Sequence, residues 1–215
     1  MKTKMNNMIF KSLPLLFACL AIFAEAFAGT PISDFRPLRD RNGIDLYYRW
    51  MQMTEEDKVR QIKAVLEING GAEDVLLLLK DEKHALGWIP SAEQFRHLAL
   101  VSESEWVSYI QFAIPWPFAD QDCILEFKSG VNEAGETVID FRCMPEYIEK
   151  VDGISRMKDV SGSFVIRRQT DGHSTLECYF ISEKASVIPR WITEPIITGS
   201  LLSLMEAIRS QLTEV

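Results

Sequence analysis

The sequence predicts an α+β fold in which a curved antiparallel sheet wraps around a long C-terminal helix. Between residues 105 and 182, strand-length segments of alternating polarity follow one another and are separated by turn residues. The proline at position 189 then opens a helix, because proline is favoured at the first helical position, and apolar residues recur at helical spacing as far as Thr213. An antiparallel sheet of this size must bury one face, and this helix carries an apolar stripe that can cover it.

The first 28 residues are predicted to be a signal peptide. Lysines precede a short apolar stretch from Ser12 to Ala24, and Ala26-Phe27-Ala28 before Gly29 fits the small-x-small pattern of a cleavage site. We therefore expect cleavage after Ala28 and export to the periplasm or the cell exterior. An uncleaved membrane anchor is the alternative, because signal and anchor differ mainly in the length of the apolar stretch, which here falls short of the ~20 residues of a transmembrane helix.

The remainder, residues 29–215, is acidic and long enough for one domain. The full sequence has a formal net charge of −8, and cleavage would remove more lysines than acidic residues. No cluster of lysine and arginine interrupts this acidic balance. The composition therefore argues against nucleic acid as a partner and against tight binding to an anionic bilayer surface.

Three cysteines remain after the predicted cleavage: Cys123, Cys143 and Cys178. An odd number leaves at least one thiol free, and the sequence does not determine whether any two of them pair. Each lies in a strand-like alternation. We interpret them as small apolar residues within the sheet.

The domain is predicted to begin with a polar arm, residues 29–42, followed by a strand pair. Ile44–Trp50 and Arg60–Ile68 both alternate with a period of two, and the charged turn between them makes them antiparallel neighbours. Two short helices are predicted before the third strand. Ala72–Lys80 is rich in leucine, and Ser91–Leu98 opens with a serine that is followed three residues later by glutamine, a capping box.

Turn signals separate the remaining strands. We expect turns at Asn132 with Gly135, at Ser161-Gly162 and at Asp171-Gly172, the last of which is a hairpin signal. The predicted strands are Glu105–Ile114, Asp122–Ser129, Glu136–Met144, Gly153–Val160, Ser163–Arg168 and Ser174–Ser182.

Five short segments, taken in their order along the chain, resemble a known family. They are Gly43-Ile44-Asp45-Leu46-Tyr47-Tyr48-Arg49, Pro115-Trp116-Pro117-Phe118 followed by Asp122, Ile154-Ser155-Arg156, Ser161-Gly162-Ser163-Phe164, and Ile188-Pro189-Arg190-Trp191. Their order and spacing resemble the START domain, the steroidogenic acute regulatory related lipid-transfer fold of the SRPBCC superfamily, over roughly residues 40–213. One departure is Gln121, which stands where the family commonly has an arginine before the aspartate.

The resemblance implies a helix-grip architecture for residues 43–215, with a tunnel for a lipid, sterol or other hydrophobic ligand between the sheet and the last helix. It implies neither a catalytic residue nor a metal or cofactor. We expect a monomer that contacts membranes only transiently. The residues expected to bind the ligand are Arg156, Tyr109, Trp116, Leu125, Phe127, Phe141, Phe180, Ile197 and Leu201.

Alternation alone does not determine which side chains of one strand point inward. On the strand from residue 105 to 114, either Trp106 or Tyr109 points inward. Ile139 and Leu176 are inward candidates on later strands. Without the family resemblance, the pattern would be interpreted as a solid core rather than as the lining of a tunnel.

Arg156 is predicted to orient the ligand. It shares a strand face with Ile154, and the resemblance places an arginine at this position inside the cavity, near a carboxylate. Asp122 and Glu126 have the opposite parity from the inward Leu125, which argues against them as partners of Arg156 unless a bulge intervenes. The alternative is a surface arginine on a solvated edge strand.

The sequence favours binding over catalysis. His84, His97 and His173 are dispersed, and neither a zinc-like spacing nor a nucleophile motif accompanies them. Two alternatives stay open: an enzyme of the cyclase or hydrolase kind on the same helix-grip scaffold, and a non-catalytic interaction module.

Expression of the full-length chain in an exporting host should give a mature protein that begins at Gly29, because the cleavage pattern lies directly before this residue. Intact-mass measurement of the exported fraction checks this. A chain that keeps Met1 and stays with the membranes would show that the segment is an anchor.

Overall fold

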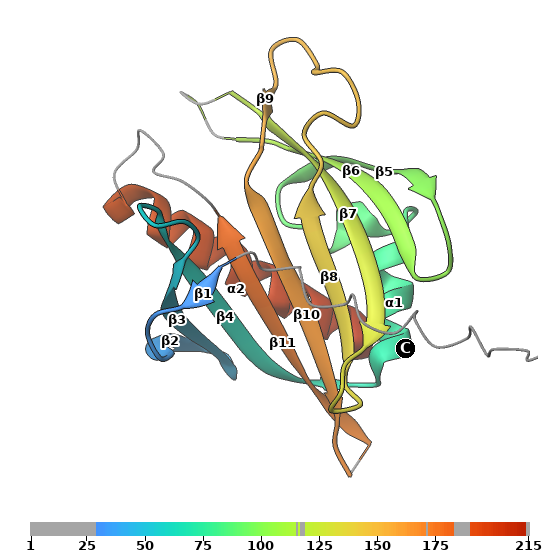
Figure 1. Ribbon diagram of the computed structural model, residues 1–215. Coiled ribbons are helices and arrows are strands. Elements are labelled where there is room, and N and C mark those ends of the chain that lie inside the picture. The colour runs from blue at the N-terminus through green and yellow to red at the C-terminus, as the bar shows by residue number, and fades with distance from the viewer. Residues whose placement is uncertain (1–28, 115, 117–118, 171, 183–189, 214–215) are drawn as a thin grey trace, which may run out of the picture.

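The structure, a computed structural model, describes residues 29–114, 116, 119–170, 172–182 and 190–213. A curved antiparallel sheet runs through the molecule, and the long helix α2, Arg190–Thr213, lies across one face of it (Figure 1). The shorter helix α1, Ala72–Lys80, packs against α2. This is the predicted architecture of a sheet wrapped around the C-terminal helix. The predicted signal peptide lies outside the described residues and stays a prediction.

Strands from the N-terminal and C-terminal parts of the chain meet in the middle of the sheet. The strand order is β1-β3-β4-β11-β10-β8-β7-β6-β5, in which neighbours run antiparallel, while β2 pairs with β3 and β9 runs parallel to β7. The strands are β1 (Thr30–Pro31), β2 (Arg36–Arg41), β3 (Ile44–Gln52), β4 (Lys58–Asn69), β5 (Ala92–Leu100), β6 (Glu105–Phe112), β7 (Gln121–Val131), β8 (Thr137–Cys143), β9 (Ser155–Arg156), β10 (Val160–Arg168) and β11 (His173–Ser182).

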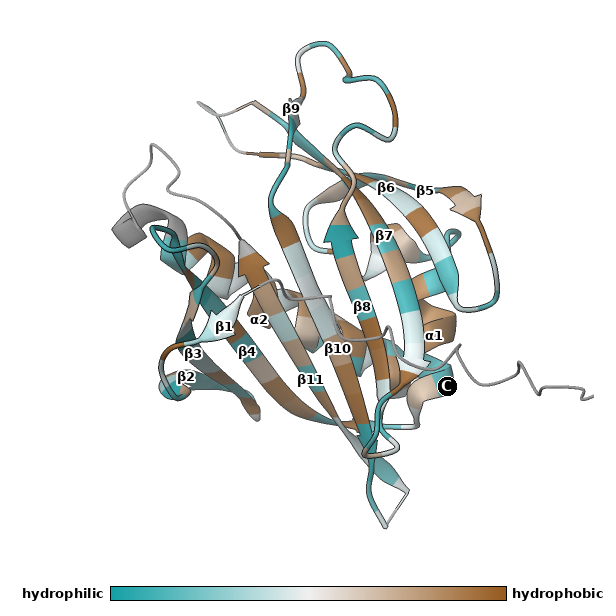
Figure 2. Cartoon of the chain, in the orientation of Figure 1, coloured by the Kyte–Doolittle hydropathy of each residue, from teal (hydrophilic) through white to brown (hydrophobic). Residues whose placement is uncertain are grey.

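Alternation along the strands separates an inner face, which the helices cover, from an outer face. Figure 2 shows the resulting bands of hydrophobic and hydrophilic residues along β7, β8, β10 and β11. The buried stripe of α2 packs in one cluster with the inward residues of β4. The residues of this contact are Ile62, Ala64, Leu66 and Ile68 on β4, and Leu201, Leu202, Met205 and Ile208 on α2.

The predicted helix at Ser91–Leu98 is wrong. These residues enter β5, which pairs along its length with β6. Ser91 has a positive φ of 60° instead of capping a helix, and its carbonyl oxygen accepts a hydrogen bond from the Ala113 amide at 2.9 Å. Pairing with a neighbouring strand thus overrides the local capping signal. A short 3-10 turn, η1 at Ala85–Gly87, follows α1 in place of the second helix.

The predicted turn at Ser161-Gly162 is also wrong. Both residues lie inside β10, which runs from Val160 to Arg168 without interruption. Of the predicted strand Gly153–Val160, the segment that pairs with a neighbour before β10 begins is Ser155–Arg156, as β9.

Gly162 serves close packing instead of a turn. A Cβ atom at this position would overlap both the ring of Phe141 and the carbonyl oxygen of Tyr179. A glycine within a strand often marks such a close approach, which sequence alone does not distinguish from a turn.

The predicted arm, residues 29–42, folds into the sheet as β1 and β2. Asn42 and Gly43 form the two-residue turn between β2 and β3, and both have positive φ angles, 54° and 72°, as a type I′ hairpin requires. Arg209 on α2 donates to the Asn42 carbonyl at 2.8 Å, and the Asn42 side-chain amide donates to Glu206 at 2.7 Å. The turn therefore ties the N-terminal strands to the C-terminal helix.

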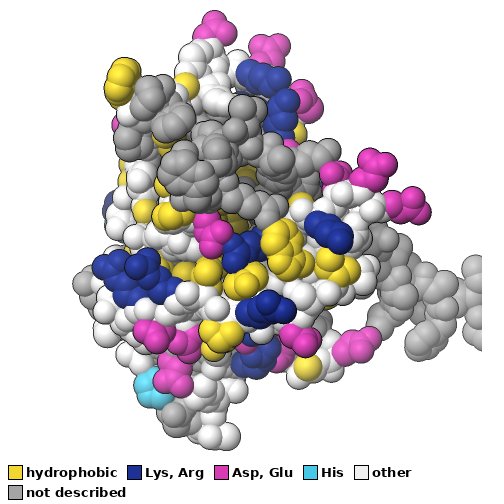
Figure 3. Space-filling model, turned by 90° about the vertical axis from the view of Figure 1, so that its left-hand side faces the viewer, with side chains coloured by type: hydrophobic (Ala, Val, Ile, Leu, Met, Phe, Trp, Pro, Cys, Tyr) yellow, Lys and Arg dark blue, Asp and Glu magenta, His cyan; other side chains and the backbone are white. Residues whose placement is uncertain are grey.

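The surface on the side of β1 to β4 mixes charged and hydrophobic side chains, as Figure 3 shows. Around Phe35, two cations lie over the aromatic ring: the guanidinium of Arg49 at 4.4 Å and the ammonium of Lys63 at 4.7 Å from its centroid. Cation–π contacts of this kind stabilise exposed strands by up to about 1 kcal/mol each.

Replacing Leu201 with aspartate should destabilise the domain by on the order of 4 kcal/mol, because an unpaired carboxylate would be buried between helix and sheet. Leu201 is 5% exposed, whereas Ile196 on the same helix is 59% exposed, so Ile196→Asp is the matched control. Chemical denaturation of both variants measures the difference. Equal stability of the two would show that α2 is not held against the sheet.

Candidate functional site

A row of aromatic rings crosses the inner face of the sheet. Trp106 on β6 stacks on Phe127 of β7, with ring centroids 5.0 Å apart and planes 5° apart. Phe127 lies 6.0 Å from Phe141 on β8, and Phe141 lies 5.5 Å from Phe164 on β10. All of these rings are buried in the cluster that includes α2. The row gives the inner face a continuous apolar surface under the helix.

The structure brings most of the predicted ligand-binding residues into this one cluster. They lie on β7, β8, β11 and α2, and all of their side chains are apolar. The predicted residues that lie in it are Leu125, Phe127, Phe141, Phe180, Ile197 and Leu201. Ile139 and Leu176, also predicted to point inward, are fully buried there.

The structure resolves the parity of β6 in favour of Trp106. Trp106 pairs with Phe127 and belongs to the inner cluster, whereas Tyr109 packs with Val107 and Ile124 in a separate cluster on the outer face. The placement of Tyr109 with the inner ligand-binding residues was therefore wrong. Burial, and after it the nearby Asp122 carboxylate, raises the pKa of Tyr109 above its ordinary value.

Trp116 does not reach the interior. It lies in the loop between β6 and β7, whose residues 115, 117 and 118 are outside the described part of the chain, and its side chain is 92% exposed. A ligand held between sheet and helix does not contact Trp116 in this arrangement.

Arg156 is buried on the outer face, in a pair with Asp122. Its Nε donates to Asp122 Oδ1 at 2.6 Å and its Nη2 to Oδ2 at 2.9 Å, and both side chains are 1% exposed. The remaining guanidinium donors go to backbone carbonyls of the β8–β9 loop, at Pro145 (2.8 Å), Ile148 (3.2 Å) and Glu149 (3.2 Å). A guanidinium has five N–H donors, so each donor of Arg156 has an acceptor.

The two hydrogen bonds to Asp122 raise the pKa of Arg156 above its ordinary value, so the guanidinium stays charged. The prediction that Asp122 is not the partner of Arg156 was wrong. Asp122 does have the opposite parity from Leu125, as the alternation requires; the error was to place Arg156 on the inner face. Because β9 pairs in parallel with β7, Arg156 lies directly beside Asp122. With its donors occupied by protein oxygens, Arg156 fixes the β8–β9 loop to the sheet.

Two indole nitrogens in the inner cluster have no hydrogen-bond partner among the described residues. Nε1 of Trp106 and Nε1 of Trp88 are both buried. An unpaired buried donor costs about 1–3 kcal/mol. An indole can only donate, so each group needs an acceptor to be satisfied.

A hydrogen-bonded serine–histidine pair on the same face was missed from the sequence. His97 on β5 and Ser108 on β6 are register partners, and His97 Nδ1 lies 3.0 Å from Ser108 Oγ. His97 Nε2 lies 3.0 Å from the Lys80 carbonyl oxygen at the end of α1. Because that oxygen can only accept, a neutral imidazole here would carry its proton on Nε2 and accept from the serine through Nδ1. A wrong helix assignment for this segment concealed the pairing.

A separate recess of about 630 Å³ lies beside the C-terminal half of α2. Asp45, Glu67, His173 and Arg209 contribute to its lining. These polar and charged residues stand beside apolar ones such as Val65 and Leu66, and none of the lining residues belongs to the aromatic row, so the recess does not have the character expected of a lipid tunnel.

Within the described part of the chain, no helix has the length and apolar character needed to cross a membrane. The same residues contain no group of three or more histidine, cysteine, aspartate or glutamate side chains placed to hold a metal ion.

Solved structures with the same architecture include STAR-related lipid transfer proteins and an aromatase/cyclase. A STAR-related lipid transfer protein from Xanthomonas axonopodis has a TM-score of 0.73 at 20% identity, over 83% of this chain and 98% of that one. Human StAR-related lipid transfer protein 5 gives 0.68 at 12% identity, over 85% and 88%. An aromatase/cyclase from Streptomyces sp. R1128 gives 0.51 at 13%, over 72% and 94%. No protein-family model and no curated protein matches the sequence.

Replacing Arg156 with methionine should destabilise the protein by about 3–5 kcal/mol, because Asp122 would be left as a buried, unpaired carboxylate. The double variant Arg156→Met with Asp122→Leu should recover a large part of this loss. Urea denaturation of the single and double variants measures the coupling.

Arg142→Met is the matched control, since Arg142 pairs with Glu126 at 2.6 Å but is 58% exposed. Its loss should stay below about 1 kcal/mol. Equal, small losses for Arg142→Met and Arg156→Met would contradict the role of Arg156 as a buried clamp.

Proposed function

We propose that this chain, which has the helix-grip fold of START-related lipid-transfer domains, binds one lipid, sterol or similar hydrophobic molecule between the sheet and α2. The observation that carries the proposal is the aromatic row from Trp106 to Phe164 beneath the helix. The similarity to lipid-transfer structures supports the same class of ligand.

The energy of binding would come from apolar burial. Each Å² of apolar ligand surface removed from water contributes about 25 cal/mol. Phe127, Phe141 and Leu201 offer apolar surface from both the sheet and the helix. A ligand would insert between them, so the contact between α2 and the sheet must open or shift when the ligand enters.

Trp106 is the proposed polar contact, in place of Arg156. Its Nε1 donor is buried without a partner among the described residues, and it lies at the end of the aromatic row. A ligand oxygen that accepted this donor would remove the cost of the unpaired group. The preferred ligand is therefore a hydrophobic molecule with a hydroxyl, carbonyl or ester oxygen, rather than a pure hydrocarbon.

A second candidate function, an enzyme on the same scaffold, has one observation in its favour. Ser108 donates to a histidine nitrogen whose tautomer is fixed, as a nucleophilic serine requires. Catalysis of acyl transfer also needs backbone donors near the serine for the developing oxyanion. However, β6 is paired on both edges, with β5 and β7, so its amides are engaged in the sheet. His97 also bonds the last carbonyl of α1, a capping role, and the geometry therefore favours binding.

Protein purified from the expressing cells should carry a lipid that native mass spectrometry detects and solvent extraction removes. After extraction, it should bind both a fluorescent sterol and a fluorescent long-chain alkane. Trp106→Phe should weaken sterol binding roughly fivefold, which corresponds to one neutral hydrogen bond of ~1 kcal/mol, and leave alkane binding unchanged.

Trp116→Phe is the control for loss of an indole, and it should change neither affinity because Trp116 is exposed. Absence of both an extracted lipid and probe binding would make the protein a non-binding interaction module. Turnover of a hydrophobic ester that disappears in Ser108→Ala would establish the enzyme instead.

A further inference from the structure

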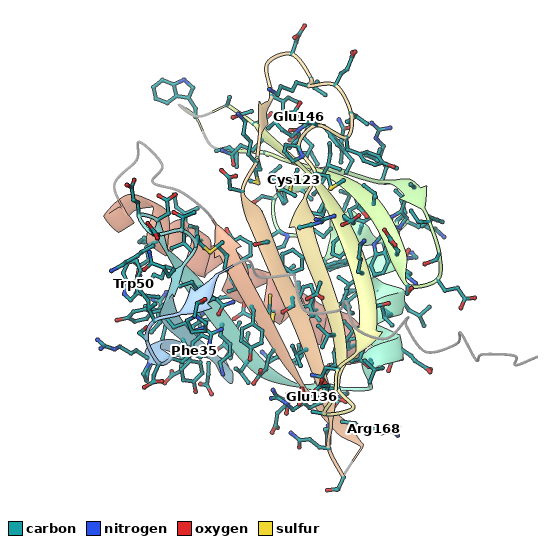
Figure 4. All side chains as sticks on the ribbon, viewed as in Figure 1. Phe35, Trp50, Cys123, Glu136, Glu146 and Arg168 are labelled. Atoms are coloured by element: carbon teal, nitrogen blue, oxygen red, sulfur yellow. The ribbon has the colours of Figure 1, made fainter. Side chains whose placement is uncertain are left out.

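Two cysteine sulfurs lie in contact at one end of the sheet. Cys123 on β7 and Cys143 on β8 have their Sγ atoms 3.2 Å apart. Cys143 is the register partner of Leu125, so the two cysteines are diagonal neighbours on adjacent strands and on the same, inner face. Figure 4 shows Cys123 near the end of the sheet, below the loop that carries Glu146.

We propose that Cys123 and Cys143 form a reversible disulfide when the protein meets a disulfide oxidant such as glutathione disulfide. A disulfide has an S–S length of about 2.04 Å, so the sulfurs need to approach by only about 1 Å. Because diagonal neighbours lie about 7–8 Å apart, slightly beyond the usual Cα span of a disulfide, the bond also requires the backbone to shift at the end of β8, where Cys143 is the last residue of the strand.

The two thiols differ in the way that a stepwise oxidation requires. Cys143 is half-buried at the last residue of β8, whereas Cys123 is buried, so an oxidant reaches Cys143 first. The hydrogen bond from the Cys123 thiol lowers the pKa of Cys143, and the same bond, together with burial, raises the pKa of Cys123. Cys143 is thus the attacking thiolate and Cys123 the resolving thiol.

The reaction balances with the oxidant alone. The Cys143 thiolate attacks one sulfur of glutathione disulfide, and one glutathione leaves as a thiolate, which gives a mixed disulfide on Cys143. The Cys123 thiol then loses its proton and attacks Cys143 Sγ, and the second glutathione leaves. Two protein thiols are oxidised to one disulfide, and one glutathione disulfide is reduced to two thiols.

The disulfide would restrain the β8–β9 loop, because Cys143 lies directly before it. Directly after Cys143, the Met144 amide donates to the Ile124 carbonyl at 2.8 Å, and the chain then enters the β8–β9 loop that Arg156 holds. A bond between Cys123 and Cys143 would fix the start of this loop to β7. Because it closes a loop of 20 residues, oxidation should raise the melting temperature by about 5–10 °C.

Cys178 provides an internal comparison. It is buried on β11, and burial raises its pKa to about 12. Cys178 is register partner to Ala64 and Phe164, so no cysteine faces it across either neighbouring strand. It should stay a free thiol under the same conditions.

The test is to incubate the folded full-length protein with glutathione disulfide, block remaining thiols, and digest with trypsin. Cleavage after Arg96, Lys128, Arg142 and Lys150 places Cys123 in peptide 97–128 and Cys143 in peptide 143–150. The expected product is these two peptides joined, lighter by two hydrogen atoms than their sum, and separated again by a reductant. Cys178 falls in another peptide, 169–184, and Cys19, where residues 1–28 are retained, falls in peptide 12–39, because trypsin does not cleave between Arg36 and Pro37; both cysteines should be found blocked.

Three variants separate the proposed pair from other thiol chemistry. Cys178→Ser should still form the linked peptide and show the rise in melting temperature. Cys123→Ser should instead accumulate glutathione on Cys143, without that rise, and Cys143→Ser should give neither product. Absence of the linked peptide in the unmodified protein, a stable glutathione adduct on its Cys143, or a link that includes Cys178 would each overturn the proposal.

Discussion

Because successive side chains of a strand point to opposite faces, β6 and β7 divide this protein into two interiors. One face of these strands carries Trp106, Leu125 and Phe127 and packs beneath α2. The other carries Tyr109, Asp122 and Ile124, as the register of the two strands requires, and the β8–β9 loop covers it. The first interior is apolar and faces a helix; the second is organised around a buried ion pair. The location of each functional feature follows from this division.

The ion pair between Arg156 and Asp122 lies on the outer face of the sheet, where hydrogen bonds to every guanidinium donor offset the cost of removing the two charges from water. A buried guanidinium and carboxylate cost several kcal/mol each to remove from water, and mutual attraction alone seldom repays this. Here Asp122 receives two bonds and three carbonyls take the other donors of Arg156. The pair therefore acts as a clamp that specifies the path of the β8–β9 loop, which has little regular structure of its own.

On the inner face of the sheet, by contrast, buried donors are left without hydrogen-bond partners within the described part of the chain. Its aromatic rings pack well, yet the indole donors of Trp88 and Trp106 have no partner among the described residues. A protein that bound nothing there would gain from replacing them with phenylalanine, since the same apolar surface would carry no unpaired donor. An oxygen of the proposed ligand would supply the acceptor that these donors lack among the described residues. The thiols of Cys123 and Cys143 lie in contact at one end of the same face, where the proposed disulfide would form.

The sequence by itself determined the strand pair at the start, the long terminal helix, two of the three predicted turns and most of the apolar inner face, because alternation and helical spacing are local properties. Tertiary structure alone decided the rest. Residues 92–98 became part of a strand because β6 offered a pairing edge, and Gly162 stayed inside β10 because the Phe141 ring needed the space. The face of Arg156 depended on the parallel register of β9 with β7, between residues far apart in the chain. Local patterns contain no information about such long-range contacts, so only the folded chain could show that Arg156 meets Asp122.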